Sequence, residues 1–316
     1  MSYADWIAVD WGTTHLRAWA MADDGRVLAA ASSDAGMGSL TRDGFEPALL
    51  ALAEGWLAPG RATLALACGM VGSRQGWVEA PYRPVPCVPL EPGGFASAPC
   101  GDGRLTVRVI PGIKQLSPAD VMRGEETQLI GALALHPSLA ETGSFILPGT
   151  HSKWAVVQGG AVTGFRTLMT GELFAVLRQH SMLGASGAEA ADDAEAFARG
   201  VAAARDSGAA GALSRLFSAR ALMLDGTLAA GSVPDYLSGL LIGEEFRAAL
   251  ADGFARRDTP LYLVGDDALC ERYRRAAALF GIELPPPIAD AAAHGLWQLA
   301  IEADLVQRHP EESRAC

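Results

Sequence analysis

The chain has 316 residues and a formal net charge of −11 at pH 7, with 25 Lys and Arg against 36 Asp and Glu. Half of its residues are hydrophobic, which is enough to bury a sizeable core and excludes disorder of the whole chain. The acidic balance, without any run of Lys or Arg, excludes the usual electrostatic footprint for nucleic acid or an anionic membrane. The length allows two domains or one large one.

The five cysteines are scattered, and no two of them have the Cys-x-x-Cys spacing. This favours reduced thiols over a disulfide framework or a zinc site. The first residues lack the basic and apolar regions of a signal peptide, and apolar stretches such as 236–243 are too short to span a bilayer. We therefore expect a soluble, cytoplasmic protein without a membrane partner.

The chain begins with short apolar runs separated by tight turns, at residues 6–10, 16–21 and 27–31. Such runs, divided by Gly12 and by Asp24-Gly25, predict three consecutive strands. Farther along, the pattern predicts helices at 45–56 and 120–135 and strands at 62–68 and 105–110.

A second round of the same pattern starts near residue 143, with strands predicted at 143–147, 153–157 and 161–167. The strand and turn order repeats that of the chain start, which indicates an internal duplication. The remaining sequence predicts a strand at 261–264 and helices at 172–183, 194–204, 209–224, 235–250, 267–280 and 290–307. Two rounds of mixed elements predict an α/β protein with two lobes around a cleft.

The first turn, Asp10-Trp11-Gly12-Thr13-Thr14, has the composition of a phosphate site. Gly12 allows close approach to the backbone, and the two threonines add hydroxyls beside the turn N–H groups. Asp10 could hold Mg²⁺ through water, because hard cations favour carboxylate oxygen. Taken alone, this pentapeptide is more simply explained as an ordinary hairpin turn, since such short patterns are common.

The second turn, Pro148-Gly149-Thr150-His151-Ser152, has the same chemistry at the equivalent place in the second round. Two such turns at matching positions favour a phosphate clamp, and hence a kinase that uses ATP. A lone histidine in a polar turn is more often a donor or a structural partner than a nucleophile, so we give His151 no catalytic role.

Several longer motifs lie between and after these turns. The most distinctive are Cys-Gly-Met-Val-Gly-Ser-Arg-Gln-Gly-Trp at 68–77, Asp-Val-Met-Arg-Gly-Glu-Glu-Thr-Gln at 120–128 and Met-Thr-Gly-Glu-Leu-Phe at 169–174. With residues 7–19, which resemble the first phosphate motif of the sugar kinase, actin and hsp70 superfamily, they make the chain similar to the 2-dehydro-3-deoxygalactonokinase family. The resemblance runs from about residue 7 to the final predicted helix.

This resemblance implies two actin-like (RNase H-like) domains around a nucleotide-binding cleft. Residues 1–140, with about 290–316, would form the N-terminal domain with the substrate site, and 141–289 the C-terminal domain with the nucleotide site. It also implies ATP, Mg²⁺ and phosphorylation of the 6-hydroxyl of 2-dehydro-3-deoxy-D-galactonate in galactonate catabolism. The alternative is a kinase of the same fold for another sugar or sugar acid. A homodimer is compatible with both.

The resemblance also assigns nucleotide contacts. Its phosphate-binding positions are Asp10, Gly12, Thr13, Thr14, Gly149, Thr150, His151 and Ser152. Gly265 and Asp266 lie where the superfamily has its adenosine turn, although the usual multi-glycine turn is absent here.

Phosphoryl transfer also needs a carboxylate that accepts the hydroxyl proton. In related sugar kinases it is an aspartate just before the helix that precedes the second phosphate turn. Asp120, at the start of the predicted 120–135 helix, is the first choice, with Glu125 and Glu126 as alternatives. A helix cap would look the same in sequence for Asp120, as would a solvated charge pair for the two glutamates.

The carboxylate of a 2-oxo acid substrate needs a donor fork. Arg74 is the best candidate, because arginine binds carboxylates bidentately and the glycines of the 69–74 loop allow close approach. Ser73 lies beside it, and Arg17, Lys114, Arg123 and Arg166 compete for the role, although an ordinary structural or surface ion pair explains each arginine equally well. Thr170 could contact a substrate hydroxyl or cap the helix predicted at 172–183.

Overall fold

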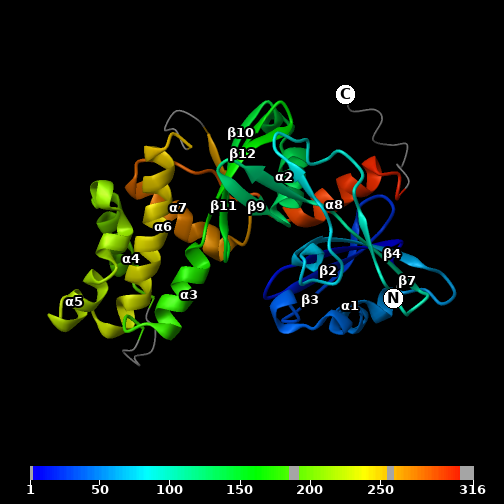
Figure 1. Ribbon diagram of the computed structural model, residues 1–316, viewed down its shortest axis with the longest axis horizontal. Coiled ribbons are helices and arrows are strands. Elements are labelled where there is room, and N and C mark those ends of the chain that lie inside the picture. The colour runs from blue at the N-terminus through cyan, green and yellow to red at the C-terminus, as the bar shows by residue number, and fades with distance from the viewer. Residues whose placement is uncertain (1–2, 185–191, 255–259, 307–316) are drawn as a thin grey trace. The chain divides into compact units, whose positions relative to one another are not determined.

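A computed structural model of the protein describes residues 3–184, 192–254 and 260–306 (Figure 1). The chain divides into two compact units. Unit 1 consists of Met1–Thr142, Val157–Gly164 and Asp290–Cys316, and unit 2 of Gly143–Val156 and Phe165–Ala289. The helix predicted at 290–307 ends at Glu302, and the part of the chain after residue 306 lies outside the described residues.

Unit 1 is built on a six-stranded sheet in the order β3-β2-β1-β4-β7-β6. Its strands are β1 (Trp6–Trp11), β2 (Leu16–Met21), β3 (Val27–Ser33), β4 (Thr63–Gly69), β6 (Ala96–Ala98) and β7 (Leu105–Val109). β1 runs antiparallel to β2 and parallel to β4. Every residue of β1 is buried, which explains why this run is apolar up to Asp10.

Helices cover both faces of this sheet. α1 (Phe45–Ala53) packs on the face that carries Ile7 and Val9, whereas α2 (Glu125–Leu135) and α8 (Ala291–Glu302) pack on the face of Trp6 and Ala8. α2 and α8 lie in such close contact that a Cβ on Gly131 would lie only 1.8 Å from the carbonyl oxygen of Ala291. The last described helix is therefore an integral part of unit 1 (Figure 1).

A small second sheet of unit 1 corrects one prediction. It has the order β5-β8-β9, with β5 (Tyr82–Pro84), β8 (Gly112–Leu116) and β9 (Ala119–Met122). The helix predicted at 120–135 begins only at Glu125, and Asp120 lies on β9 opposite Gln115 of β8. Gly124, at φ +110°, separates strand from helix in a conformation that favours glycine. The strong helix formers that follow had made the segment look like one helix.

Unit 2 contains most of the four-stranded sheet β12-β11-β10-β13, in which β10 and β13 are parallel, whereas residues 157–164, at the end of β11 and the start of β12, belong to unit 1. Its strands are β10 (Thr142–Leu147), β11 (Ser152–Gln158), β12 (Ala161–Leu168) and β13 (Leu261–Leu263). Its helices are α3 (Thr170–His180), α4 (Ala194–Arg205), α5 (Ser218–Leu224), α6 (Val233–Ala251) and α7 (Asp267–Leu279). The helix predicted at 209–224 is therefore wrong, because 3-10 turns at Gly208–Ala210 and Ala212–Arg215 replace its first part.

Helix α6 forms the centre of unit 2 and lies beside α4 (Figure 1). Glycines allow the two backbones to approach, since a Cβ on Gly200 of α4 would lie 2.0 Å from the carbonyl oxygen of Tyr236. Most of α6 is buried, including the charged side chain of Glu245. A glutamate buried this deeply needs hydrogen-bond donors around it.

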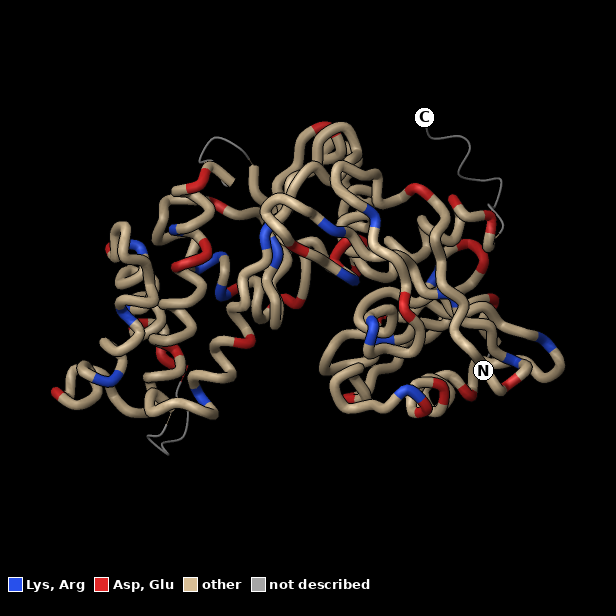
Figure 2. Tube along the Cα trace, in the orientation of Figure 1, with Lys and Arg blue, Asp and Glu red and all other residues tan. Residues whose placement is uncertain are grey.

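The charged residues show no segregation by sign. Along the trace, Lys and Arg are interspersed with Asp and Glu (Figure 2). Among the described residues, no helix is both long enough and apolar enough to cross a membrane.

Candidate functional site

Turn one (residues 10–14) connects β1 and β2 and is held by main-chain hydrogen bonds. Gly36 N donates to the carbonyl oxygen of Thr14 at 3.2 Å, and Gly38 N to that of Thr13 at 2.9 Å. A Cβ on Gly36 would lie 2.2 Å from the carbonyl carbon of Thr14, so only glycine fits there. The side chains of Thr13 and Thr14 are exposed. Turn one therefore exposes two hydroxyls on a backbone that the hydrogen bonds from Gly36 and Gly38 hold in place.

Asp10 is 8% exposed, and one side chain contacts each of its carboxylate oxygens. Arg17, its cross-strand partner on β2, donates to Oδ2, and the Sγ of Cys68 lies 3.7 Å from Oδ1. Arg17, which we expected at the substrate, therefore pairs with Asp10 in this structure. Asp10 and the threonine hydroxyls are hard oxygen donors, which suits Mg²⁺.

No group of three or more His, Cys, Asp or Glu among the described residues could hold a metal ion.

Three elements meet beside turn one. Gly69 ends β4 at φ +91°, where a Cβ would lie 2.5 Å from the carbonyl oxygen of Trp11, and a Cβ on Gly124 would lie 3.2 Å from the Cα of Gly69. These backbone contacts join the ends of β1 and β4 to the N-terminus of α2. We call the four side chains gathered there the acidic junction: Asp10, Cys68, Glu125 and Glu126.

Within the acidic junction, Glu126 points into the interior and is 2% exposed. Both of its carboxylate oxygens accept from Gly124 N at 2.8 Å, and the Thr127 hydroxyl lies 3.3 Å from Oε1. Burial, with the charge of Glu125 second, raises the pKa of Glu126 to about 8. Burial, with Asp10 and Glu126 next, also raises the pKa of the Cys68 thiol well above its usual range.

Glu125, the first residue of α2, is only partly buried. Its Oε2 accepts from Arg123 N at 2.9 Å. Asp120, the first choice from sequence, is on the β8–β9 hairpin, where its Oδ1 accepts from Val121 N at 2.7 Å. The structure thus gives the helix-start position to Glu125 and not to Asp120.

Two of the expected substrate residues lie at the loop after β4. Ser73 is part of the loop, and Arg123, which follows β9, packs against it. The Oγ of Ser73 and the Nη1 of Arg123 are buried and have no hydrogen-bond partner among the residues that the structure describes. Nη1 lies against Gly72, where a Cβ would come within 2.7 Å of it. Arg123 Nη2 donates to Ala80 O at 2.7 Å, and its guanidinium stacks 4.1 Å from the centroid of the Tyr82 ring. Buried polar atoms without partners are rare and call for an explanation, and a role in binding is one.

Arg74, the preferred substrate residue, is exposed at the end of the same loop. Its carbonyl oxygen accepts from Arg42 Nη2 at 3.1 Å, which ties the loop to a neighbouring segment of unit 1. The guanidinium is thus carried on a fixed backbone.

Turn two (residues 148–152) connects β10 and β11 and packs on the first turn of α3. Glu172 N donates to Thr150 O at 3.0 Å, and the Nε2 of His151 lies 2.5 Å from the Oε2 of Glu172. A Cβ on Gly171 would lie 2.6 Å from the carbonyl oxygen of Gly149, so glycine is required at this contact. The space around the Cα of Gly149 itself is open.

Two expected ligand contacts in unit 2 have their hydroxyls occupied by the protein. Ser152 is fully buried and donates to the Oε2 of Glu245 at 2.9 Å, and Thr170 also hydrogen-bonds to Glu245. Sequence reasoning missed Glu245 and its partner Tyr273. The available signal was the Glu244-Glu245 pair inside the apolar run of α6.

The expected adenosine residues follow β13. Gly265 adopts φ +148°, and the Oδ1 of Asp266 accepts from the N–H groups of Ala268 and Leu269, both at 3.1 Å. The side chain of Asp266 therefore caps α7, which leaves the backbone around Gly265 as the part of this turn that a ligand can use.

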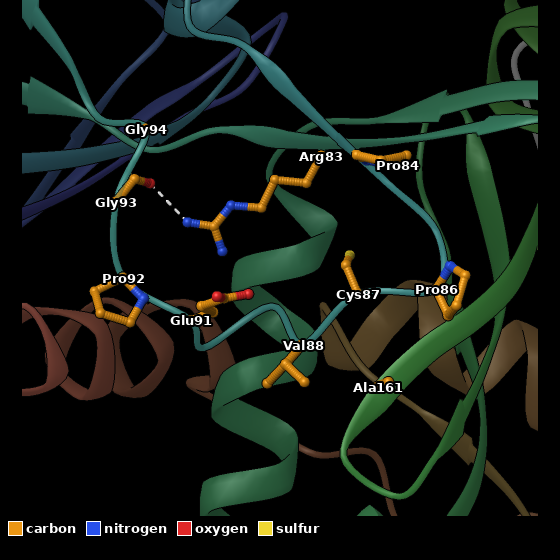
Figure 3. Close-up of a pocket in the computed structure, with 10 residues that line it drawn as sticks. All are labelled: Arg83, Pro84, Pro86, Cys87, Val88, Glu91, Pro92, Gly93, Gly94 and Ala161. Carbon is orange, nitrogen blue, oxygen red and sulfur yellow. Dashed lines mark hydrogen bonds between the residues drawn. The ribbon is translucent and has the colours of Figure 1, made fainter.

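An open hollow of about 690 Å³ lies in unit 1 (Figure 3). The lining comes mainly from the segment of residues 83–94. Figure 3 shows the Arg83 guanidinium inside this segment, donating to Gly93 O at 2.6 Å, with the Glu91 carboxylate near it. The lining includes none of the expected site residues. We therefore do not assign the candidate site to this hollow. We assign it to the two turns and the acidic junction.

Comparisons with known proteins agree with these features. The family model described as 2-keto-3-deoxy-galactonokinase matches residues 10–299. A probable 2-dehydro-3-deoxygalactonokinase, DgoK1 of Rhizobium meliloti (strain 1021), is 40% identical over 305 residues, covering 92% of this chain and 97% of its own. The 2-dehydro-3-deoxygalactonokinase of Escherichia coli (strain K12) is 37% identical over 291 residues, covering 92% and 94%.

One crystal structure, of a Sinorhizobium meliloti protein named for the same activity, superimposes with a TM-score of 0.81. The two chains are 37% identical, with 93% of this chain and 98% of that chain covered. With the sheets and the two units described above, this match confirms the predicted α/β class with two actin-like domains.

Proposed function

The chain belongs to the 2-keto-3-deoxy-galactonokinase family, and from this premise we propose that it phosphorylates 2-dehydro-3-deoxy-D-galactonate with ATP. The γ-phosphoryl group is transferred to the 6-hydroxyl, which gives the 6-phosphate and ADP in galactonate catabolism. The observation that carries the proposal is that the matched region, residues 10–299, contains both glycine-threonine turns and the whole acidic junction.

For the nucleotide, we assign the phosphates to the two turns. The exposed hydroxyls of Thr13 and Thr14 and the open backbone at Gly149 support this assignment. The N-terminus of α3 packs against turn two, and a helix N-terminus favours bound anions. The backbone at Gly265 would contact the adenosine.

Asp10 would hold Mg²⁺ through water. When bound, the ion neutralises charge that develops on the phosphate oxygens. Asp10 is suited to this task because one of its oxygens is fixed by Arg17 and its backbone lies in a fully buried strand.

We assign Glu125 as the base that accepts the proton of the 6-hydroxyl. It is the partly exposed carboxylate at the start of α2, whereas Glu126 is buried and Asp120 lies on a hairpin. A positioned carboxylate is the usual base in phosphoryl transfer to a hydroxyl. This replaces Asp120, because the argument for Asp120 depended on a helix start that the structure places at Glu125.

The carboxylate and 2-oxo group of the substrate would be recognised by Arg74, Ser73 and Arg123. Arg74 supplies an exposed guanidinium, and the other two hold polar atoms that no group of the protein satisfies. Arg17 is not needed for this task, because it pairs with Asp10.

The test is release of ADP from ATP and Mg²⁺ with a panel of sugar acids. We expect turnover with 2-dehydro-3-deoxygalactonate and much less with its gluconate epimer or with neutral sugars. A higher kcat/KM for another sugar acid would favour the alternative, a kinase of the same fold with a different acceptor. ADP release that needs no acceptor would contradict the proposal.

A further inference from the structure

Glu245 of α6 lies at the centre of unit 2 with 1% of its surface exposed. Its Oε2 accepts from the Ser152 hydroxyl at 2.9 Å and from the Trp154 indole N–H at 2.8 Å, and its Oε1 accepts from the Tyr273 hydroxyl at 2.5 Å. Thr170 gives a fourth side-chain hydrogen bond. We call these five residues the Glu245 network.

The network is fully occupied by protein groups. Burial raises the pKa of Glu245, and the hydrogen bonds from Thr170, Tyr273, Trp154 and Ser152 oppose that shift. Burial and the charge of Glu245 raise the pKa of Tyr273 well above its usual range, so that its hydroxyl remains a donor. Four donors around one carboxylate leave it no capacity for a ligand, so its role must be exerted through its partners.

Two of those partners, Ser152 and Thr170, lie at turn two and at the helix on which the turn packs. Ser152 is the last residue of the turn and the first of β11, and Thr170 is the first residue of α3. Between them, Glu172 N and the Glu172 carboxylate contact Thr150 and His151 of the turn. One buried carboxylate therefore ties the end of turn two to the helix on which the turn packs.

We propose that Glu245 is a positioning residue, which holds turn two and the start of α3 in the arrangement that binds nucleotide phosphates. This rests on the proposed function only in that turn two is taken to bind nucleotide. Glu245 itself touches neither nucleotide nor acceptor. Its effect is on where the open backbone of Gly149 and Thr150 lies, and misplaced binding groups lose affinity steeply.

The chemistry of the side chain makes two variants informative. Glu245→Ala leaves the Trp154 N–H, which can only donate, without an acceptor. Glu245→Gln can keep its oxygen toward Ser152 and Trp154 while its amide donates to the Tyr273 oxygen. The Tyr273 hydroxyl can then turn to Ser152 Oγ, which lies 3.2 Å away. Glutamine should therefore preserve most of the geometry.

The experiment measures ADP affinity by calorimetry, together with kcat, the KM for ATP and the KM for the sugar acid, well below the melting temperature of every variant. For Glu245→Ala we expect ADP affinity to fall and the KM for ATP to rise by roughly tenfold or more, with the KM for the sugar acid nearly unchanged. Glu245→Gln should restore most of this loss. Unchanged ADP affinity in folded Glu245→Ala would overturn the proposal, as would equal losses for both substrates.

Glu244→Gln is the matched control, because Glu244 is the neighbouring residue of α6 and bonds to Ala212 N and Arg247 instead. It should lose stability without any change in ADP affinity. If Glu245→Ala does not fold, Tyr273→Phe removes one donor and keeps the ring. It should weaken ADP binding about threefold or more, and no change would refute the proposal. Absence of ADP binding by the wild-type protein would instead refute the proposed function itself.

Discussion

Each unit buries one glutamate close to a glycine-threonine turn, but the two glutamates are surrounded very differently. Glu126 in unit 1 accepts from the main-chain N–H groups of Gly124 and of Glu126 itself and from the Thr127 hydroxyl, and burial raises its pKa to about 8. Glu245 in unit 2 accepts four side-chain hydrogen bonds. One carboxyl is held mainly by main-chain N–H groups at the start of a helix, and the other is held by four side chains.

The surroundings follow the same division. Among the described residues, every buried side-chain polar atom without a partner belongs to unit 1, and two of these atoms, on Ser73 and Arg123, lie at the loop after β4. Proteins tolerate unsatisfied polar groups mainly where function requires them. Under the proposed function, unit 1 would use these polar atoms for the acceptor, while the buried polar groups of unit 2 would hold the backbone of turn two for the nucleotide phosphates.

The largest expected effect tests whether the base lies in the acidic junction. Glu125→Gln should lower kcat by roughly 10²- to 10⁴-fold while ADP affinity stays near that of the wild type, because only the proton acceptor is lost. Asp120→Asn is the matched control, and its kcat should change little. Steady-state kinetics and calorimetry check both. Equal or larger loss in Asp120→Asn would return the role to the β8–β9 hairpin.

The next effect tests whether turn one is fixed by main chain, in contrast to turn two. Gly36→Ala places a Cβ where the backbone of Thr14 now lies, at 2.2 Å, so the turn must move. We expect the KM for ATP to rise by about tenfold and stability to fall by about 1–3 kcal/mol. Gly103→Ala is a control for stability of the same unit, because its Cβ meets nothing within 4 Å and its backbone is not in the left-handed region. An unchanged KM in Gly36→Ala would show that turn one tolerates displacement.

A third prediction concerns the buried carboxyl of Glu126. The pKa of Glu126 is raised from 4.5 to about 8, so the folded protein keeps a proton that the unfolded chain loses. The stability that this group contributes is full below about pH 4.5 and is lost as pH rises toward about 8, by up to about 1.4 kcal/mol per pH unit. Glu126→Gln, which stays neutral, should therefore gain stability over the wild type as pH rises.

Denaturant unfolding between about pH 5 and pH 8.5 checks this. The difference in the free energy of unfolding between Glu126→Gln and the wild type should widen by a few kcal/mol over that range. Parallel pH profiles for the two proteins would mean that Glu126 is ionised in the folded state over this range and that its pKa is not raised.

The smallest expected effect concerns the unsatisfied hydroxyl of Ser73. Because its Oγ has no partner, Ser73→Ala should change the free energy of unfolding by less than about 0.5 kcal/mol. Loss of a contact to the acceptor should raise the KM for the sugar acid by about three- to tenfold and leave the KM for ATP unchanged. A large loss of stability with unchanged KM would show that the hydroxyl serves the fold.

Much of this protein follows from the sequence by itself. The buried β1 strand, both glycine-threonine turns and most of the helices are marked by local patterns, since apolar runs and glycines act over a few residues. The distinctive motifs between the turns gave the family and, through it, the fold. The helices predicted at 120–135 and 209–224 were wrong only in their first parts, where a strand that precedes Gly124 and two 3-10 turns, respectively, take the place of helix.

Tertiary structure alone decided which carboxylates matter and how. Asp120, Glu125 and Glu126 are neighbours in sequence, yet one lies on a hairpin, one is partly exposed at a helix start and one is buried. Glu245 is 93 residues from Ser152, and the bond between them leaves no periodic trace in the sequence. Burial and long-range hydrogen bonds depend on which elements pack together, and a local pattern of residue types does not carry that information.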